Sequence, residues 1–433
     1  MLGAAPTSAE TLAEALAAAY ANNAALNAQR AALRATDEGV PQALAGYRPT
    51  ISGSADVGVK NTSGVTTHPR GVALSIVQPI FSGHRTKNAV KIAETAVLAG
   101  RETLRRVEQD TLLAAVQAFM GLVRAQAILN LRNQNVSFQG EQVKAADDRL
   151  SVGEGTRTDV AQTKASLAAG QSELNAASAA LNTAIALYEL TIGHRPTRLG
   201  NAQAVDPMLP ASLDASLAAA MKKNPSILAA GYNVDIASFN VNVLEGAKLP
   251  SVTLTGSLSH RDDVSTPGSV SNSASLVGAV SIPIYAGGSR NSAVREAKQT
   301  LGQRRIEYDL ARAQIRQAVI SAWGSLDAAR AQIRAANARV SAERLVLSGV
   351  TEERKVGQRT TLDVLNAQQD LLDARVGQVR AQHDRVVAAY ALLVAIGMLD
   401  ARSLGLKVKY YDPGDHYGQV RDLWHGLRTT DGR

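Results

Sequence analysis

The chain of 433 residues contains no cysteine, and only 4% of its residues are aromatic. Without cysteine there can be no disulfide, no thiolate metal site and no cysteine nucleophile. With so few aromatic rings, the chain is poorly suited to a thick core of large side chains. Alanine, glutamine and arginine dominate long stretches instead. Such stretches suit thin layers of helices, because alanine lets neighbouring backbones approach closely.

Long blocks of one charge are missing as well. The net charge is +8, from 46 lysines and arginines against 38 aspartates and glutamates, but the two signs are interleaved along the chain. A nucleic-acid surface needs clustered basic residues. Solvated helix faces are therefore the favoured interpretation, and we expect no nucleic-acid partner.

No uninterrupted apolar run is long enough for a transmembrane helix. The longest, residues 386–399, has 14 residues, whereas a spanning helix needs about 20. If the chain crosses a membrane, we expect it to do so by strands. The first ten residues also lack a charged segment followed by an apolar run. We therefore expect either a cytoplasmic protein or an exported chain whose signal peptide has been removed.

Two copies of one unit make up the chain. The segment "VGEGTRTDV" (152–160) returns 204 positions later as "VGQRTTLDV" (356–364), and "PIFSG" at 79–83 returns as "PIYAG" at 283–287. Because a repeat of this length determines the architecture of the whole chain, we interpret it before any single motif. We predict four segments: a first repeat at 1–193, a linker at 194–211, a second repeat at 212–399 and a C-terminal tail at 400–433.

Each repeat is predicted to run helix, strand, strand, long helix, helix. Alternation of apolar and polar residues predicts four strands, at about 48–60, 71–81, 249–261 and 274–285. Proline-free helical patterns predict long helices at 84–151 and 288–354, each about 100 Å long at 1.5 Å per residue. A single shorter helix is expected over Thr11–Ala45, and another closes the first repeat at 158–192.

The predicted strands have the length of tilted transmembrane strands, although one strand alone favours a soluble antiparallel sheet. Phe81 and Tyr285 end the return strands at equivalent places, as an interfacial aromatic girdle would, and ordinary packing is an equal alternative. Four strands cannot close a barrel, and an open sheet would leave unpaired edges in lipid. Closure needs eight or twelve strands, and hence two or three chains.

The two matching segments at 152–160 and 356–364 are predicted to be the tips of helix hairpins. Gly153 and Gly357 end the long helices in a left-handed conformation. Asp159 and Asp363 then fall in the first turn of the returning helix, where the helix dipole favours a carboxylate. Capping alone is a sufficient reason for each tip. The candidate N-caps are all threonines: Thr156, Thr158, Thr360 and Thr361.

This duplicated order and the paired tips closely resemble the TolC family of outer-membrane export ducts, over about residues 8–400. The second tip followed by "LNAQQDLLDAR" is the most specific part. The resemblance implies an α+β membrane protein that forms a homotrimer, with four strands per chain in a twelve-stranded outer-membrane β-barrel and a long periplasmic α-helical barrel. It also implies partners: a periplasmic adaptor protein, an inner-membrane ABC transporter or other pump, an exported polypeptide or small molecule, and outer-membrane lipid.

The same resemblance implies a gate at the tips. Asp363 falls where the family has a carboxylate ring at the tunnel constriction, and Asn366 occupies the position of a second ring. Arg359 and Asp159 match positions that hold the closed state by polar contacts between helices. Arg354 stands where the family has a tyrosine in that network, so this part of the lock must differ.

No catalytic constellation is visible, and the seven histidines are scattered. We therefore expect no enzyme, no cofactor and no metal site. The leading hypothesis is the exit duct of a type I protein secretion system, because the tail at 410–427 resembles those of type I secretion members from alphaproteobacteria. The duct of a multidrug or metal efflux pump is the alternative. A soluble, trimeric helical scaffold is the alternative from another class.

Overall fold

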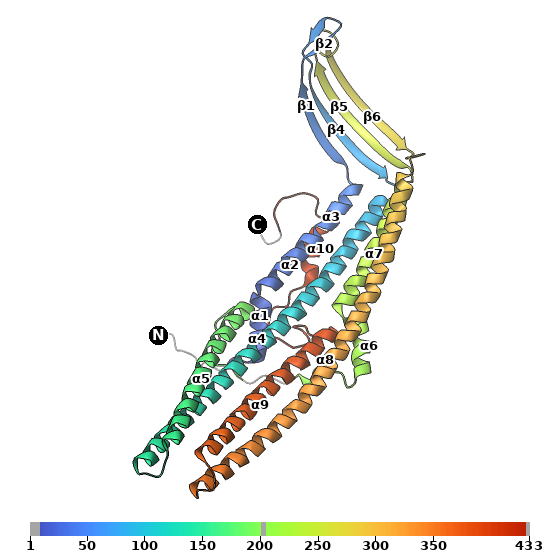
Figure 1. Ribbon diagram of the computed structural model, residues 1–433. Coiled ribbons are helices and arrows are strands. Elements are labelled where there is room, and N and C mark those ends of the chain that lie inside the picture. The colour runs from blue at the N-terminus through green and yellow to red at the C-terminus, as the bar shows by residue number, and fades with distance from the viewer. Residues whose placement is uncertain (1–8, 201–204, 430–433) are drawn as a thin grey trace. The chain divides into compact units, whose positions relative to one another are not determined.

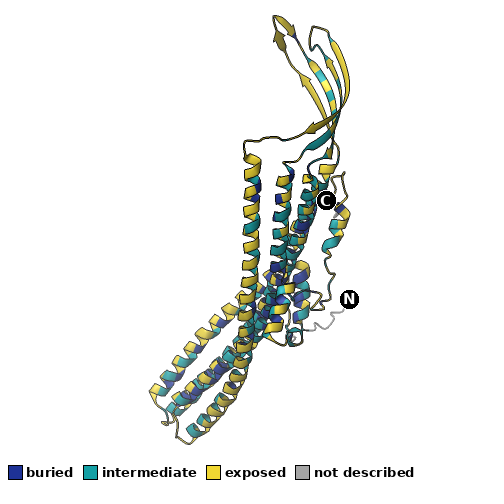
Figure 2. Ribbon diagram, turned by 90° about the vertical axis from the view of Figure 1, so that its right-hand side faces the viewer, coloured by how far each residue is buried: buried dark blue, intermediate teal, exposed yellow. Residues whose placement is uncertain are grey.

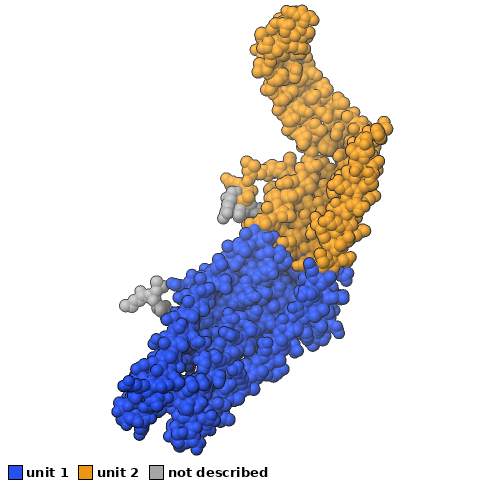
Figure 3. All heavy atoms as spheres, in the orientation of Figure 1, with its two compact units in different colours: residues 1–29, 105–225, 312–411 blue, residues 30–104, 226–311, 412–433 orange. Residues whose placement is uncertain are grey.

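The computed structural model describes residues 9–200 and 205–429. The chain divides into two compact units, each drawn from both halves of the sequence (Figure 3). One unit, called the helical unit here, comprises 1–29, 105–225 and 312–411; the other, the sheet unit, comprises 30–104, 226–311 and 412–433. The long helices α4 (Arg85–Ser151) and α8 (Ser289–Lys355) contribute residues to both.

Two helix hairpins form the helical unit, α4 with α5 and α8 with α9 (Figure 1). The largest fully buried side chains come from different helices, among them Phe119 on α4, Tyr188 on α5 and Leu393 on α9. In the hairpins, α5 spans Arg157–Ile192 and α9 spans Thr361–Ile396. The unit also contains α1 (Leu12–Asn22), η2 (Asp206–Met208) and α6 (Leu213–Lys223).

The sheet unit contains a four-stranded antiparallel sheet in the order β1-β4-β5-β6. A short hairpin, β2 with β3, follows β1 and turns at Ser63 and Gly64, both with positive φ. The strands are β1 (Thr50–Val57), β2 (Lys60–Thr62), β3 (Val65–Thr67), β4 (Arg70–Phe81), β5 (Ser251–Asp262) and β6 (Val270–Ser281). Its helices are α3 (Gly39–Leu44), η1 (Ala45–Tyr47) and α10 (Pro413–Val420), together with most of α2 (Ala24–Asp37) and of α7 (Pro225–Gly246).

The predicted return strand at 274–285 is displaced in the structure. Strand β6 begins four residues earlier and ends at Ser281. Pro283 explains the early end, because proline has no N–H to donate to a strand ladder. Tyr285 therefore lies beyond the strand and is 87% exposed, whereas Phe81 is the last residue of β4.

The single helix predicted over Thr11–Ala45 is wrong, because the structure breaks it into α1, α2 and α3. The first break is at Asn23, whose backbone is extended. The Oδ1 atom of Asn23 accepts from the N–H groups of Ala25 and Leu26, and its Nδ2 donates to the carbonyl of Thr191 at 3.0 Å. This asparagine ends one helix, caps the next and ties both to the end of α5.

The second repeat has the same junction. Nδ2 of Asn224 donates to the carbonyl of Ala395 near the end of α9, at 3.0 Å, and α7 begins at the next residue, Pro225. Proline at the first helical position costs no hydrogen bond. Both repeats thus join a broken helix end to end with the returning helix of a hairpin.

One described helix, α4, contains an 18-residue stretch that is long and apolar enough to cross a membrane. This is weak evidence, because a core helix of a soluble protein passes the same test. The stretch is not an uninterrupted apolar run, because a few polar residues lie within it.

Candidate conduit surfaces and gate

The register of the four-stranded sheet gives it one apolar and one polar face. Because side chains alternate between the faces, opposed residues in neighbouring strands share a face. Two rows of opposed residues form the centre of the apolar face: Ile51, Ile76, Gly256 and Leu276 in one, and Gly53, Leu74, Leu258 and Ala274 in the next. The row between them consists of serines on the other face: Ser52, Ser75, Ser257 and Ser275.

The apolar face is open to its surroundings. Ile51 is 67% exposed and Leu276 is 74% exposed, and Figure 2 shows most of the strand surface coloured as exposed. A sheet with an apolar face and a serine-lined face suits a boundary between lipid and water. The register therefore supports the transmembrane interpretation of the strands.

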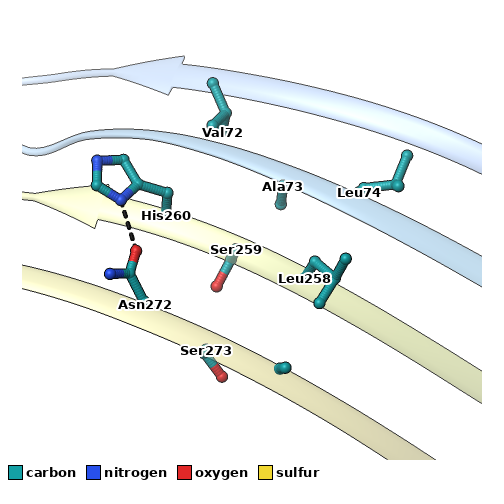
Figure 4. Close-up of a pocket in the computed structure, with 9 residues that line it drawn as sticks. Val72, Ala73, Leu74, Leu258, Ser259, His260, Asn272 and Ser273 are labelled. Atoms are coloured by element: carbon teal, nitrogen blue, oxygen red, sulfur yellow. Dashed lines mark hydrogen bonds between the residues drawn. The ribbon is translucent and has the colours of Figure 1, made fainter.

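The apolar face ends in a polar row near the β4–β5 and β5–β6 strand ends. Figure 4 shows the open hollow there, where the row of Leu74 and Leu258 is followed by the row of Val72, His260 and Asn272. The Nδ1 atom of His260 lies 2.6 Å from Oδ1 of Asn272. In the following row, Arg70 and Asp262 form an ion pair at 3.2 Å. Polar and charged side chains thus join the aliphatic ones towards this end of the apolar face.

Both hairpin tips are built on the same capping box. In the first, Thr156 Oγ1 accepts from the N–H of Asp159 at 3.1 Å, and Asp159 Oδ2 accepts from the N–H of Thr156 at 3.2 Å. Thr360 and Asp363 repeat the pattern at 2.9 and 3.1 Å. The hydrogen bond from the Thr360 N–H lowers the pKa of Asp363 below its usual value.

The tip glycines and threonines have separate roles. Gly153 (φ +83°) and Gly357 (φ +79°) adopt the left-handed conformation predicted from the sequence. The prediction of Thr158 and Thr361 as N-caps is wrong, since they are the second residue of α5 and the first of α9. In a capping box, the threonine stands three residues before the residue whose N–H donates to it. Thr156 stands in this position before Asp159, and Thr360 before Asp363.

The predicted lock residues lie close to the tips but do not pair as a set within one chain. Arg359 Nε donates to Glu353 Oε2 of its own hairpin at 2.8 Å. Asp363 is partly exposed, and Asn366 is exposed one turn farther along α9. Within the described part of the chain, no ion pair joins Arg359 to Asp159.

Arg354, close to the tip, makes a contact between the two hairpins. Its Nη1 donates to Gln142 Oε1 on α4 at 3.1 Å, while its Nε and Nη2 are buried without a hydrogen-bond partner in the described structure. Burial and the nearby Arg149 lower the pKa of Arg354, and Asp159 opposes this change. An unsatisfied buried guanidinium is costly, so this contact is poorly stabilised.

Two residues in this region were not found from the sequence. Gln142 lies in the middle of a helical pattern, and nothing in its local sequence marks it. Glu353 precedes Arg359 by six residues, a spacing that becomes a contact only once the hairpin turns. Neither residue carries a local signal, because both contacts depend on how the helices pack.

A family model described as outer membrane efflux protein matches residues 15–192 and 217–398. The chain belongs to this family. Its membership confirms the outer-membrane location and the exit-duct role predicted from the sequence, and it rules out the soluble scaffold. The chain is therefore one of a family of outer-membrane channels.

Relatives of the chain span most of its length. It is 47% identical to the outer membrane efflux protein BepC of Brucella suis biovar 1, over 93% of this chain and 89% of BepC. It is 26% identical to the alkaline protease secretion protein AprF of Pseudomonas aeruginosa, over 83% and 75%. It is 24% identical to the outer membrane protein TolC of Escherichia coli, over 86% and 78%.

Solved structures share the fold of this chain. The CmeC outer membrane channel of Campylobacter jejuni matches with a TM-score of 0.80 at 17% identity, over 95% of this chain and 89% of CmeC. The open state of the MtrE outer membrane channel of Neisseria gonorrhoeae matches with a TM-score of 0.76 at 19% identity, over 90% of each chain. The α+β fold class predicted from the sequence is confirmed.

Proposed function

We propose that three copies of this chain close into one exit duct, in which twelve strands form the barrel and the helix hairpins form a tunnel. The sheet supports closure by more than one chain, and the resemblance to TolC-family ducts supports three copies rather than two. Among the described strands, β1 and β6 each have one edge without a partner, while the apolar face is suited to lipid. Unpaired edges are not tolerated in a bilayer, and pairing β1 of one chain with β6 of the next removes them.

Mass measurement of the detergent-extracted protein tests this proposal. Three copies per particle are expected by light scattering or mass photometry, with cross-links that connect β1 to β6 of a second copy. A particle that stops at two copies would reject trimeric closure while leaving the family assignment in place.

We further propose that the tips form the gate, with one contact inside each chain and one between chains. The inside contact is Arg354 with Gln142. The sequence predicts that Arg359 and Asp159 make polar contacts between helices, and we propose that these helices belong to neighbouring chains. Exposed ion pairs contribute little one at a time, but three copies of each act on a single opening. Asp363, one turn inside the tip, then sets the charge of the neck.

Single-channel conductance in planar bilayers tests the gate. Arg354→Gln and Arg359→Ser are each expected to raise conductance without dissociating the trimer. Asp363→Ala is expected to reduce cation preference while leaving the open conductance similar. If both arginine variants keep the parental conductance and only melt earlier, the residues act as structural contacts and the gate is rejected.

Two candidate functions differ in the cargo that the duct exports. We propose protein export with an adaptor protein and an ABC transporter, supported by the likeness of the tail to type I secretion members and by AprF, which is named for protease secretion. The likeness to BepC, named an efflux protein, favours small-molecule efflux. No enzymatic activity is part of either proposal.

A deletion strain separates the two cargoes. Loss of specific polypeptides from the culture medium, with unchanged drug susceptibility, is expected for protein export. Sensitisation to several small molecules, with an unchanged set of secreted proteins, would replace protein export with efflux.

A further inference from the structure

The C-terminal tail is tied firmly to the sheet unit through α10. Nδ1 of His416 lies 2.9 Å from Oδ2 of Asp37, which is fully buried. The guanidinium of Arg101 stands over the ring of Tyr417 at 5.3 Å. Val420, at the end of α10, is 1% exposed. These contacts hold the helix in one place and fix where the chain that follows it must emerge.

Beyond α10 the chain reaches the start of the sheet. The carbonyl of Leu423 accepts from Nη1 of Arg48 at 3.5 Å, and β1 begins two residues after Arg48, at Thr50. The neighbouring Tyr47 is 50% exposed. The segment Leu423–Leu427 therefore lies beside the junction at which helix gives way to strand.

This segment exposes its large apolar side chains. Leu423 is 41% exposed, Trp424 is 73% exposed and Leu427 is fully exposed. The ring of Trp424 makes an edge contact with that of His425, at 5.4 Å between centroids. Arg421 before the segment is paired with Glu94 at 3.3 Å and is followed by Asp422, so Arg428 after it is the flanking basic residue. Exposed leucine and tryptophan side chains followed by an arginine are suited to a lipid surface, since tryptophan favours the interface and a basic side chain is attracted to anionic headgroups.

The position of the junction identifies this lipid surface. The apolar face of the sheet begins with Ile51, one residue into β1. Hydrocarbon must cover that face, so the headgroup layer lies at the level of the residues just before it, including Arg48. The helices follow on this side of the sheet, which makes it the periplasmic side of the outer membrane.

We propose that Leu423–Leu427 is an interfacial anchor that inserts Leu423, Trp424 and Leu427 into the headgroup layer of the periplasmic leaflet. The anchor is continuous with the lipid-facing surface of the sheet and adds apolar contact below it. It depends on the outer-membrane location and is independent of the number of subunits and of the cargo.

The two tryptophans of the chain, Trp323 and Trp424, give a direct test. Trp323→Phe leaves Trp424 as the single tryptophan of the full-length protein, and Trp323→Tyr provides a second background should phenylalanine disturb α8. Each variant is reconstituted into vesicles of phosphatidylcholine and phosphatidylglycerol, with and without phospholipids brominated near the headgroup. Trp424 is expected to lose most of its emission to the brominated lipids and to be protected from acrylamide.

Trp424→Phe is the matched control. It leaves Trp323 in α8, about 50 Å along the helix from its start at Ser289. The emission of Trp323 is expected to be the same with and without brominated lipid. Quenching of Trp424 by acrylamide alone would mean that the segment is in water. Protection of Trp424 from both quenchers would mean that a protein covers it, either a neighbouring copy or a partner. Either result overturns the anchor.

Discussion

Helices α5 and α9 are equivalent in the two repeats, yet the protein buries them very differently. Each has 36 residues, begins with a Thr–Asp capping box and ends at a left-handed glycine, Gly193 or Gly397. Seven residues of α5 are buried, against fourteen of α9. The ends of a helix are thus set by its own sequence, whereas burial is set by its neighbours.

The neighbours of α9 account for the difference. Its Gln368 bonds to Asn135 on α4, at 3.4 Å between Nε2 and Oδ1, and its Gln378 bonds to Asn337 on α8, at 2.8 Å between the same atom types. Helix α9 therefore has a helix from each hairpin beside it. Helix α5 leaves Leu190 79% exposed. In the proposed trimer, this open side of α5 is where a second chain packs.

The largest expected effect is a loss of stability when a core leucine is shortened, and it should differ between the two helices. Leu393→Ala on α9 removes a fully buried side chain and should lower the free energy of unfolding by about 2–5 kcal/mol. Leu190→Ala on α5 shortens a side chain that a neighbouring copy would cover, so in the assembled protein it should cost less than Leu393→Ala. Guanidinium unfolding in detergent measures both. Equal losses would mean that the two helices are equally packed and would remove the basis of the comparison.

A charge on the open side of α5 tests what covers it. Leu190→Glu should leave the chain folded but prevent the trimer from forming, because a subunit interface would have to bury an unpaired carboxylate. Leu190→Met is the volume-conserving control and should assemble normally. Native mass spectrometry in detergent gives the number of copies. A stable trimer from Leu190→Glu would show that this side of α5 is not a subunit contact.

The helix junctions should respond alike, because there the two repeats agree. Asn23→Ala and Asn224→Ala each remove a side-chain hydrogen bond to the end of the returning helix. Each should cost about 1–2 kcal/mol, the usual range for a lost cap or buried hydrogen bond. Hydrogen exchange of the last turns of α5 and α9 locates the change. A loss confined to one repeat would show that only that junction is structural.

The smallest expected effect concerns the cap of α9 and acid. The pKa of Asp363 is lowered in the folded tip, so its stabilisation is present above the ordinary aspartate pKa of about 3.9 and is lost as pH falls through the lower folded value. Asp363→Asn should therefore melt earlier than the unchanged protein at neutral pH. The two melting curves should converge on acidification. A constant difference down to strongly acidic pH would exclude the carboxylate as the cause.

Much of the fold was predictable, because the spacing of apolar residues along the sequence indicates the helices and strands. The proline-free pattern predicted α8 at 288–354, and the structure has it at Ser289–Lys355. Alternation predicted both faces of the sheet, which the register bears out. The break at Asn23 was not predictable in the same way. Its side chain bonds to Thr191, which lies far away in the sequence, and helical spacing continues on both sides.

The tips show the same division between local and distant causes. Gly153 and Gly357 were predictable because a helix end needs a residue that adopts positive φ. The N-caps were predicted only to within two residues, because each tip has two threonines close together and only one of them caps the helix. The partner of Arg354 could not be predicted, since Gln142 lies on a different helix and only packing brings them together. The roles of Arg359, Asp159 and Asp363 in an assembled gate stay predictions.

The unpaired edges of β1 and β6 also constrain how the protein reaches the membrane. Under the proposed closure, a lone protomer has no finished barrel, so its stability cannot be separated from protomer concentration. Exposed strand edges also pair indiscriminately in water. Insertion and assembly must therefore occur together, and their rate should rise steeply with the supply of newly exported chains. A cell that makes too little of this protein should lose it to proteolysis, rather than accumulate partly built ducts.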